Sequence, residues 1–461
     1  MPSGGISAVW EPTYPLGPDA LIPLLIGRRL EMFKALEEND SYYELSLLFT
    51  DMADDLRAMG HITGASGAEL KILGDRTLNN RSMFMLLHSI PKDLLRSVIL
   101  GTTAFEMLQS RRPARYSLHG PGAYVVSMAI EGRGGKWLCR REIEQLIGLL
   151  QRYLDAFEAW KNHRGIPTSD EDKELNLFAK EIDTQYGRRD PKKQLDMRFI
   201  RDSSVWKLED FIASLKRRCD PSLPDSDIVR QISSPLYTGC SKSMKTRVTV
   251  YDPSNGLKNV NDLWALVCSV LSSMGKYPKA VVVPVIRTWN RGDLPLAEIL
   301  VTMLASSMVC HDGFNGHGPG TATDGGTVDE LKEAEKYVLV HEPHLLTNIE
   351  TTNREMARRE SYLRNCNIVG SFPNRKTKAL LDEVQKRYHD VRATMDKWET
   401  SYKKLMANEK ELEAKLAAAE KYVEYLKHVE AIFRAIVAVS DQRSEQDDDT
   451  AQLAISAMSI A

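Results

Sequence analysis

The chain has 461 residues, of which 43% are hydrophobic and 27% are charged, enough for two or three domains with sizeable cores. Its formal net charge of −2 excludes a globally basic protein, so any contact with nucleic acid has to come from a local patch. The six cysteines are scattered and form no CxxC pair, which argues against a disulfide framework and a structural zinc site. No signal peptide or membrane-spanning segment is recognisable. We expect an intracellular protein, nuclear or cytoplasmic, that has no membrane partner.

The first part of the chain, residues 1–110, reads as a helical N-terminal region. Residues 1–19 are rich in Pro and Gly and are expected to be a loosely held lead-in. Apolar residues then recur at helical spacing over 20–60 and 70–108. The whole chain is therefore expected to have an α+β fold that is predominantly helical.

Residues 111–235 are expected to hold one strand followed by helices. Ala123–Ile130 is rich in β-branched and apolar residues and ends at a turn of glycines. The spacing of apolar residues then predicts a helix over Arg141–Trp160 and another over Trp206–Arg218.

A local excess of positive charge follows. Between Arg188 and Arg247 there are 14 Lys or Arg residues against 8 Asp or Glu residues. A solvated helical face and a site for the nucleic-acid backbone both fit such an excess. The candidate backbone-binding residues are Arg188, Arg189, Lys192, Lys193, Lys242 and Lys245.

Residues 236–320 look like a small mixed α/β domain. Leu236-Tyr237-Thr238 is β-prone and stops at Gly239, a helix is predicted over Leu263–Met274, and Ala280–Ile286 reads as a strand buried on both faces. The next helix starts at Leu294 and carries Glu298, the sole carboxylate in a nearly uncharged run. A carboxylate in such a run is costly to bury unless it is paired, hydrogen-bonded or bound to a metal. Position 298 can also lie on an exposed edge of the helix.

Residues 328–440 are expected to be helical and to contain a long coiled coil. Apolar residues alternate by three and four from Leu381 to Val437, with charges between them. A continuous helix of that length needs a partner helix, from this chain or from a second copy in a homo-oligomer. Residues 441–461 form an acidic and then weakly apolar tail that we expect to be disordered.

Several of these residues together resemble the GIY-YIG nuclease domain. Tyr237-Thr238-Gly239 resembles its second strand motif, and Arg247 follows ten residues later, after Ser and Lys residues. Tyr251 falls where that family often has His or Tyr. Glu298 resembles the family's metal-ligand Glu, and Asn315 resembles the Asn that follows it. The resemblance covers about 80 residues, and each of its motifs is short.

The chain departs from the family at the first strand. No GIY triplet stands directly before Tyr237. The segment Pro121–Val126 resembles the missing strand, but its Tyr124 lies 113 residues upstream of Tyr237. An insertion between the two strands is required, and the strand ends can stay adjacent across it because loop closure grows only logarithmically with length.

The resemblance implies a chemistry for the cleavage of phosphodiesters. Glu298 would hold one Mg²⁺, Arg247 would neutralise the phosphoryl oxygens, and Tyr237 with Tyr124 would position or deprotonate the attacking water. Asn315 would brace the site. The displaced first strand leaves open whether catalysis is retained.

The sequence is therefore compatible with two functions from different classes. One is a GIY-YIG-like, Mg-dependent nucleic-acid endonuclease, with its activity retained or lost. The other is a non-catalytic coiled-coil scaffold or nucleic-acid-binding protein. A zinc site at Cys310, His311 and His317 is disfavoured because no fourth ligand accompanies them.

Overall fold

The computed structural model describes residues 20–430 apart from gaps, of which the longer ones are 59–80, 163–167, 187–196, 221–226, 321–325 and 369–381. The expected lead-in (1–19), the expected tail (441–461) and the four basic residues between 188 and 193 lie outside the described residues. The chain divides into two compact units, Met1–Leu381 and Asp382–Ala461. The described part is predominantly helical with a small sheet, as expected.

The helices of the N-terminal region form one layer of the first unit. They are α1 (Gly27–Glu37), α2 (Tyr43–Leu47), α3 (Phe49–Ala58), α5 (Arg81–Ser89), α6 (Lys92–Leu100) and α7 (Thr103–Met107). Their apolar faces join one core with the helix α13 (Asp293–Ala305) and with one face of the sheet.

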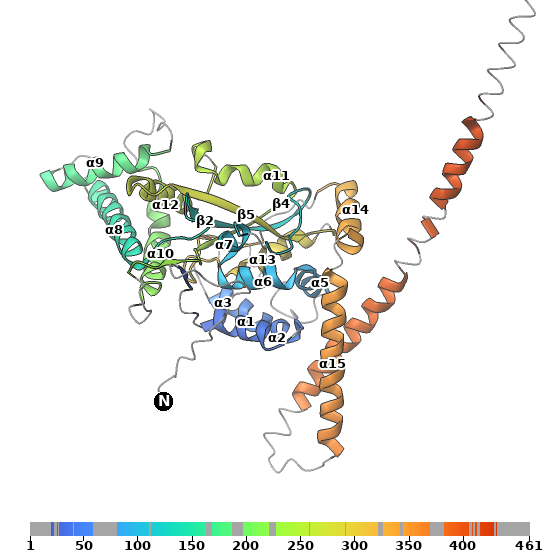
Figure 1. Cartoon of the computed structure of the whole chain (residues 1–461). Coiled ribbons are helices and arrows are strands. Elements are labelled where there is room, and N and C mark those ends of the chain that lie inside the picture. The colour runs from blue at the N-terminus through green and yellow to red at the C-terminus, as the bar shows by residue number, and fades with distance from the viewer. Residues whose placement is uncertain are drawn as a thin grey trace, which may run out of the picture. The chain divides into compact units, whose positions relative to one another are not determined.

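The sheet has three antiparallel strands and lies inside the first unit (Figure 1). The middle strand is β2 (Gly122–Ile130), which pairs with β4 (Leu236–Ser241) on one side and β5 (Pro278–Arg287) on the other. The segment 236–320, expected to be a small mixed α/β domain, contributes β4 and β5 to this sheet. The expectation that 280–286 is buried on both faces was wrong for its first half, because β5 is an edge strand and 279–282 are partly or fully exposed.

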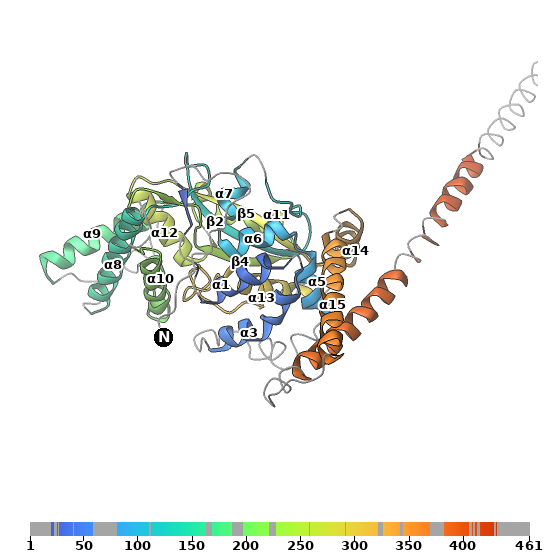
Figure 2. The ribbon, with the colours of Figure 1, turned by 60° about the horizontal axis from the view of Figure 1, so that its bottom comes forward.

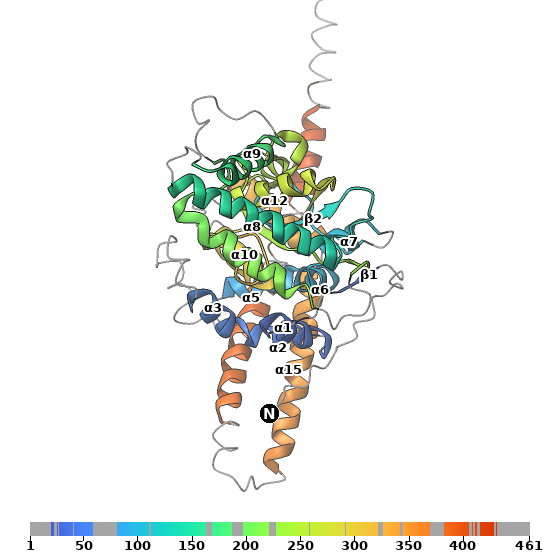
Figure 3. The same ribbon diagram turned by 90° about the vertical axis from the view of Figure 1, so that its left-hand side faces the viewer.

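The chain between β2 and β4 is a helical insertion. It contains α8 (Arg140–Asn162), α9 (Asp170–Thr184) and α10 (Val205–Arg217), and then β3 (Arg230–Gln231), a short strand that pairs with β1 (Ala20–Leu21). These helices gather beside α12 (Asp262–Ser273), as Figures 2 and 3 show. Together they form a second core on the other face of the sheet.

The two cores follow from the alternation of side chains along β2. Ala123 and Val125 point to the core of α13, whereas Tyr124 and Val126 point to the core of α8, α10 and α12. All nine residues of β2 are buried. The central strand therefore carries no solvent-facing side, and helices cover both faces of the sheet.

Shorter elements complete the first unit. After β4 come α11 (Met244–Arg247) and two 3₁₀ turns, Val248–Tyr251 and Pro253–Asn255. After α13 come α14 (Val328–Lys336), a π-helical turn (Tyr337–His341) and α15 (His344–Ile368). None of the helices in the described part of the chain combines the length and the apolar character needed to span a bilayer.

The second unit is helical where the structure describes it, over 382–404, 411–412 and 415–427 and at 408 and 430. Four early members of the apolar repeat are buried, namely Tyr388, Val391, Met395 and Trp398, whereas Val384 is 41% exposed. The later members Leu412, Leu416, Val423 and Leu426 are between 46% and 65% exposed. Phe433 and Val437 lie outside the described residues.

Candidate functional site

The pairing of β2 with β4 places two candidate tyrosines on the same face of the sheet. Tyr124 lies opposite Gly239 and Val126 lies opposite Tyr237. Because side chains alternate along a strand, Tyr124 and Tyr237 both point to the core of α8, α10 and α12. The insertion thus leaves the two strand segments adjacent although 113 residues separate the tyrosines.

A third tyrosine connects the other two. Tyr251 ends the 3₁₀ turn after α11, and its hydroxyl lies 3.1 Å from the hydroxyl of Tyr124. Its ring centroid lies 5.2 Å from that of Tyr237. Tyr124 and Tyr251 are buried and Tyr237 is half-buried.

Burial raises the pKa of all three tyrosine hydroxyls. For Tyr237 the neighbouring Tyr251 and the carboxylate of Glu298 add to the effect. The phenols are therefore neutral at pH 7 and suited to donating hydrogen bonds. This electrostatic setting opposes deprotonation of water by Tyr237 or Tyr124 and favours their positioning role.

Arg247, the last residue of α11, borders this tyrosine cluster. Its guanidinium carbon lies 5.8 Å from the centre of the Tyr251 ring, and Nη1 donates to the carbonyl of Asn259 at 3.2 Å. The side chain makes no ion pair with a carboxylate in the part of the chain that the structure describes. Arg247 is thus a half-buried cation with remaining donors.

Tyr237 and Arg247 both line a cleft of about 320 Å³. Its other polar residues include Lys207 from α10, Asp262 from the first turn of α12, and His317 from the loop after Asn315. Lys207 Nζ donates to His317 Nε2 at 2.8 Å. The cleft therefore combines two cations, a neutral imidazole and one carboxylate.

The pKa values of Lys207 and His317 are both lowered, in each case chiefly by burial. The charge of Lys207 lowers that of His317 further. An anion in the cleft would raise the pKa values of both Lys207 and His317. Sequence reasoning missed Lys207 because it is one of many basic residues in its stretch, and His317 because it appeared only as a rejected zinc ligand.

Glu298 lies beside β4 but does not line this cleft. It is half-buried, and its Oε2 accepts a hydrogen bond from the backbone N–H of Gly320 at 2.9 Å. The Cys240 thiol is its neighbour: burial and the Glu298 carboxylate both raise the pKa of that thiol. Cys240 points to the α13 face of β4, whereas Tyr237 points to the opposite face. The charge of Glu298 nevertheless raises the pKa of Tyr237.

Asn315 is a structural clamp on β4. Its Oδ1 accepts from Thr238 N and its Nδ2 donates to Thr238 O, both at 2.8 Å. The side chain is 7% exposed. Asn315 thus completes the outer edge of β4 and positions the loop that carries His317 and Gly320. That Asn315 braces a catalytic site stays a prediction.

The expected backbone-binding lysines fall into two groups. Lys242 and Lys245 are exposed at and just before the start of α11, close in sequence to Arg247. The residues Arg188, Arg189, Lys192 and Lys193 lie outside the described residues. His311 lines a different cavity from His317, and no cluster of three or more metal-ligating side chains occurs among the described residues.

Comparison of the chain with protein-family models, with curated proteins and with solved structures gives no match. A function for the chain is therefore inferred from the geometry of this cleft.

Proposed function

We propose that the first unit is a GIY-YIG-like module that binds the phosphodiester backbone of a nucleic acid in the cleft beside Tyr237 and Arg247. The observation that carries the proposal is the pairing of β2 with β4. It gathers Tyr124, Tyr237, Tyr251 and Arg247 at one site, although the first strand is displaced by a long insertion.

Binding follows from the charges of the cleft. The planar guanidinium of Arg247 can donate two parallel hydrogen bonds to phosphate oxygens, and Lys207 adds a second cation. The exposed Lys242 and Lys245 extend the positive surface toward the next phosphates. Such contacts hold the backbone and read no sequence.

Cleavage would also require Mg²⁺ held by Glu298, a carboxylate on α13 that does not line the cleft. Glu298 offers a hard oxygen donor, and a single carboxylate suits Mg²⁺, which usually keeps several of its waters. The bound ion would stabilise the leaving oxygen. The neutral hydroxyl of Tyr237 would orient the attacking water, and Arg247 would stabilise charge on the phosphoryl group.

Two measurements on the same variants test binding and cleavage separately. Binding of labelled single- and double-stranded DNA and RNA is measured by fluorescence anisotropy in EDTA, and cleavage of the same oligonucleotides is measured in Mg²⁺. Arg247→Gln and Lys207→Gln should each weaken binding and lower its dependence on salt by about one counterion. Glu298→Gln should abolish cleavage and leave binding in EDTA unchanged.

Arg141→Gln, on the exposed side of α8, is the matched control and should bind like the wild type. Absence of binding by the wild type to every oligonucleotide would sink the proposal. Binding without cleavage would leave the module as a nucleic-acid-binding protein.

The exposed apolar stripe of the second unit supports a second proposal, self-association through a coiled coil. Leu412, Leu416, Val423 and Leu426 follow the three–four spacing of a coiled-coil seam and are about half or more exposed. A second copy of the chain would cover them. Leu416→Glu together with Val423→Glu should reduce the mass measured by light scattering, whereas Ala417→Glu on the opposite side of the helix should not. A monomeric wild type contradicts this proposal.

A further inference from the structure

A second cavity, separate from the Tyr237 cleft, lies where α1, α3, α10 and the end of α13 meet. Its volume is about 310 Å³. It is lined by charged and polar side chains from four segments, together with Met52, Leu56 and Met303. The charged and titratable ones are Arg28, Arg29, Asp55, Arg217, Cys310 and His311.

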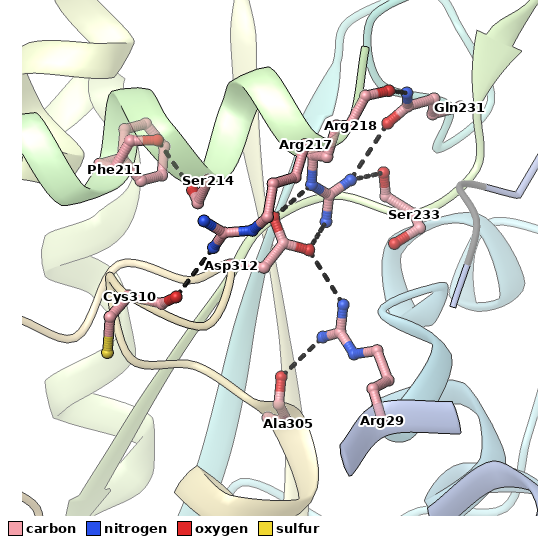
Figure 4. Close-up of polar contacts among 10 residues, drawn as sticks. All are labelled: Arg29, Phe211, Ser214, Arg217, Arg218, Gln231, Ser233, Ala305, Cys310 and Asp312. Carbon is pink, nitrogen blue, oxygen red and sulfur yellow. Dashed lines mark hydrogen bonds and ion pairs between the residues drawn. The ribbon is translucent and has the colours of Figure 1, made fainter. Parts of the chain in front are cut away.

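Arg29, in the wall of this cavity, belongs to a largely buried network around Asp312 (Figure 4). The Asp312 carboxylate accepts hydrogen bonds from Arg29 Nη1 at 3.0 Å and from Arg218 Nη2 at 2.6 Å. One carboxylate therefore serves two guanidinium groups. The network keeps a net positive charge inside the protein.

Arg29 is held rigidly but is not fully satisfied. Its Nη2 donates to the carbonyl of Ala305 at 2.8 Å, at the end of α13. Its Nε is buried and has no hydrogen-bond partner in the described part of the chain. The side chain is 10% exposed, and burial lowers its pKa. A buried donor without a partner is costly, and the guanidinium adds positive charge beside the cavity.

Arg217 is a second cation without a countercharge. Its Nη2 donates to the carbonyl of Cys310 at 2.8 Å, and no ion pair of Arg217 occurs among the described residues. Arg28, by contrast, is already paired with Glu31 and Asp55. The uncompensated charge of the cavity therefore belongs to Arg217 and to the Arg29–Asp312–Arg218 network.

The positive charges around the cavity also affect His311. The residue is solvent-exposed, but desolvation by the surrounding cavity wall lowers its pKa most; Asp55 raises it, and Arg29 and Arg217 lower it further. The imidazole makes no hydrogen bond among the described residues. Its ring nitrogens can therefore donate to or accept from a ligand at the cavity wall.

We propose that this cavity is a binding site for a small tetrahedral oxyanion, either inorganic phosphate or the phosphate group of a small phosphate monoester. Arg217 and His311 supply donors, and Arg29 supplies positive charge. The site shares no lining residue with the Tyr237 cleft, so it is independent of the nucleic-acid proposal.

Isothermal titration calorimetry of the full chain tests the site. Inorganic phosphate and glycerol phosphate are titrated at constant ionic strength, with chloride as the competing salt. We expect saturable binding at one site per chain, and tighter binding of the monoester if the apolar wall of the cavity contacts its carbon chain. Arg217→Gln should weaken binding by about tenfold or more, since one charge-assisted hydrogen bond is lost. Arg217→Lys should bind with intermediate affinity.

Arg358→Gln is the control, because Arg358 is an 84% exposed arginine on α15. It should bind like the wild type. Circular dichroism of each variant shows whether the chain is folded. Absence of saturable binding by the wild type, or unchanged binding by folded Arg217→Gln, overturns the proposal.

The titration of His311 gives a further readout with sulfate, whose charge is constant between pH 5 and 8. Arg29, Asp55 and Arg217 face His311 from α1, α3 and α10. A bound anion stabilises the protonated imidazole, so sulfate should bind more tightly as the pH falls. His311→Gln should remove most of this pH dependence. An equal pH dependence in the variant contradicts the role of His311.

Discussion

The side chain of Asn315 stabilises the edge of β4 through two hydrogen bonds to one residue, Thr238. Asn315→Ala leaves a buried N–H and a buried carbonyl without partners, which costs about 2–3 kcal/mol of unfolding free energy. Urea denaturation measures this loss. The control Asn162→Ala, at the exposed end of α8, should change stability by about 0.5 kcal/mol or less. Equal effects of the two substitutions would show that the clamp is not stabilising.

His88 provides a prediction of pH dependence at the same scale. Its Nδ1 lies 2.8 Å from Phe84 O and its Nε2 lies 2.9 Å from Thr352 Oγ1, so it joins α5 to α15. Burial lowers its pKa to about 4 from 6.5. The unfolded chain therefore binds a proton between these values that the folded chain does not. Stability should fall by roughly 3 kcal/mol as the pH falls from 6.5 to 4.

Urea denaturation at several pH values checks this prediction. His88→Gln should lose the part of the pH dependence that falls between pH 6.5 and 4. His119→Gln, which changes an exposed histidine, should retain it. Identical pH profiles for wild type and His88→Gln would refute the assignment.

At the scale of elements, the approach of β2 to β4 depends on a glycine. A Cβ at Gly239 would lie 2.8 Å from the hydroxyl and 3.0 Å from the Cζ of Tyr124, whose ring is buried. Gly239→Ala should therefore displace Tyr124, destabilise the fold by about 1–3 kcal/mol and weaken nucleic-acid binding in the cleft.

Gly148→Ala is the matched substitution inside α8, where a Cβ meets open space. It should raise stability by about 0.5–1 kcal/mol, because Ala is the better helix former. Thermal unfolding shows whether each substitution stabilises or destabilises the protein. A stabilised Gly239→Ala variant would show that the strands tolerate a wider separation.

Local sequence patterns predicted where single helices and strands lie better than they predicted which elements pack or pair with one another. The apolar spacing placed the helices near Arg141–Trp160 and Leu263–Met274, close to the observed α8 and α12. It wrongly predicted 280–286 to be buried on both faces, because an apolar run does not reveal that a strand lies at the edge of a sheet. The adjacency of β2 and β4 was predicted only from the resemblance of short motifs to those of a known family.

Sequence motifs likewise singled out only some of the residues that gather at the cleft. Tyr124, Tyr237 and Arg247 belong to short motifs that can be recognised in a sequence. Lys207 and His317 come from segments 110 residues apart and carry no local signal. The Arg29–Asp312 pair spans 283 residues. Such contacts are set by the packing of whole elements, which periodicity does not encode.

At the scale of the whole molecule, the sheet separates two cores, each with its own cavity. The Tyr237 cleft belongs to the face packed by α10 and α12, and the arginine-lined cavity lies between α1, α3 and α13. α10 contributes to both, with Lys207 near its start and Arg217 at its end. A ligand in one cavity can therefore stabilise the element that supports the other.

The two cores lie within Met1–Leu381, apart from the later helical repeat. A chain ending at Leu381 should therefore fold on its own and bind oligonucleotides like the full chain. It should lose the self-association that the exposed Leu412–Leu426 stripe predicts. Circular dichroism, anisotropy and light scattering of the two chains measure these three properties. A truncated chain that folds but still self-associates would place the contact between copies in the first unit, whereas a truncated chain that does not fold would show that the first unit depends on the second.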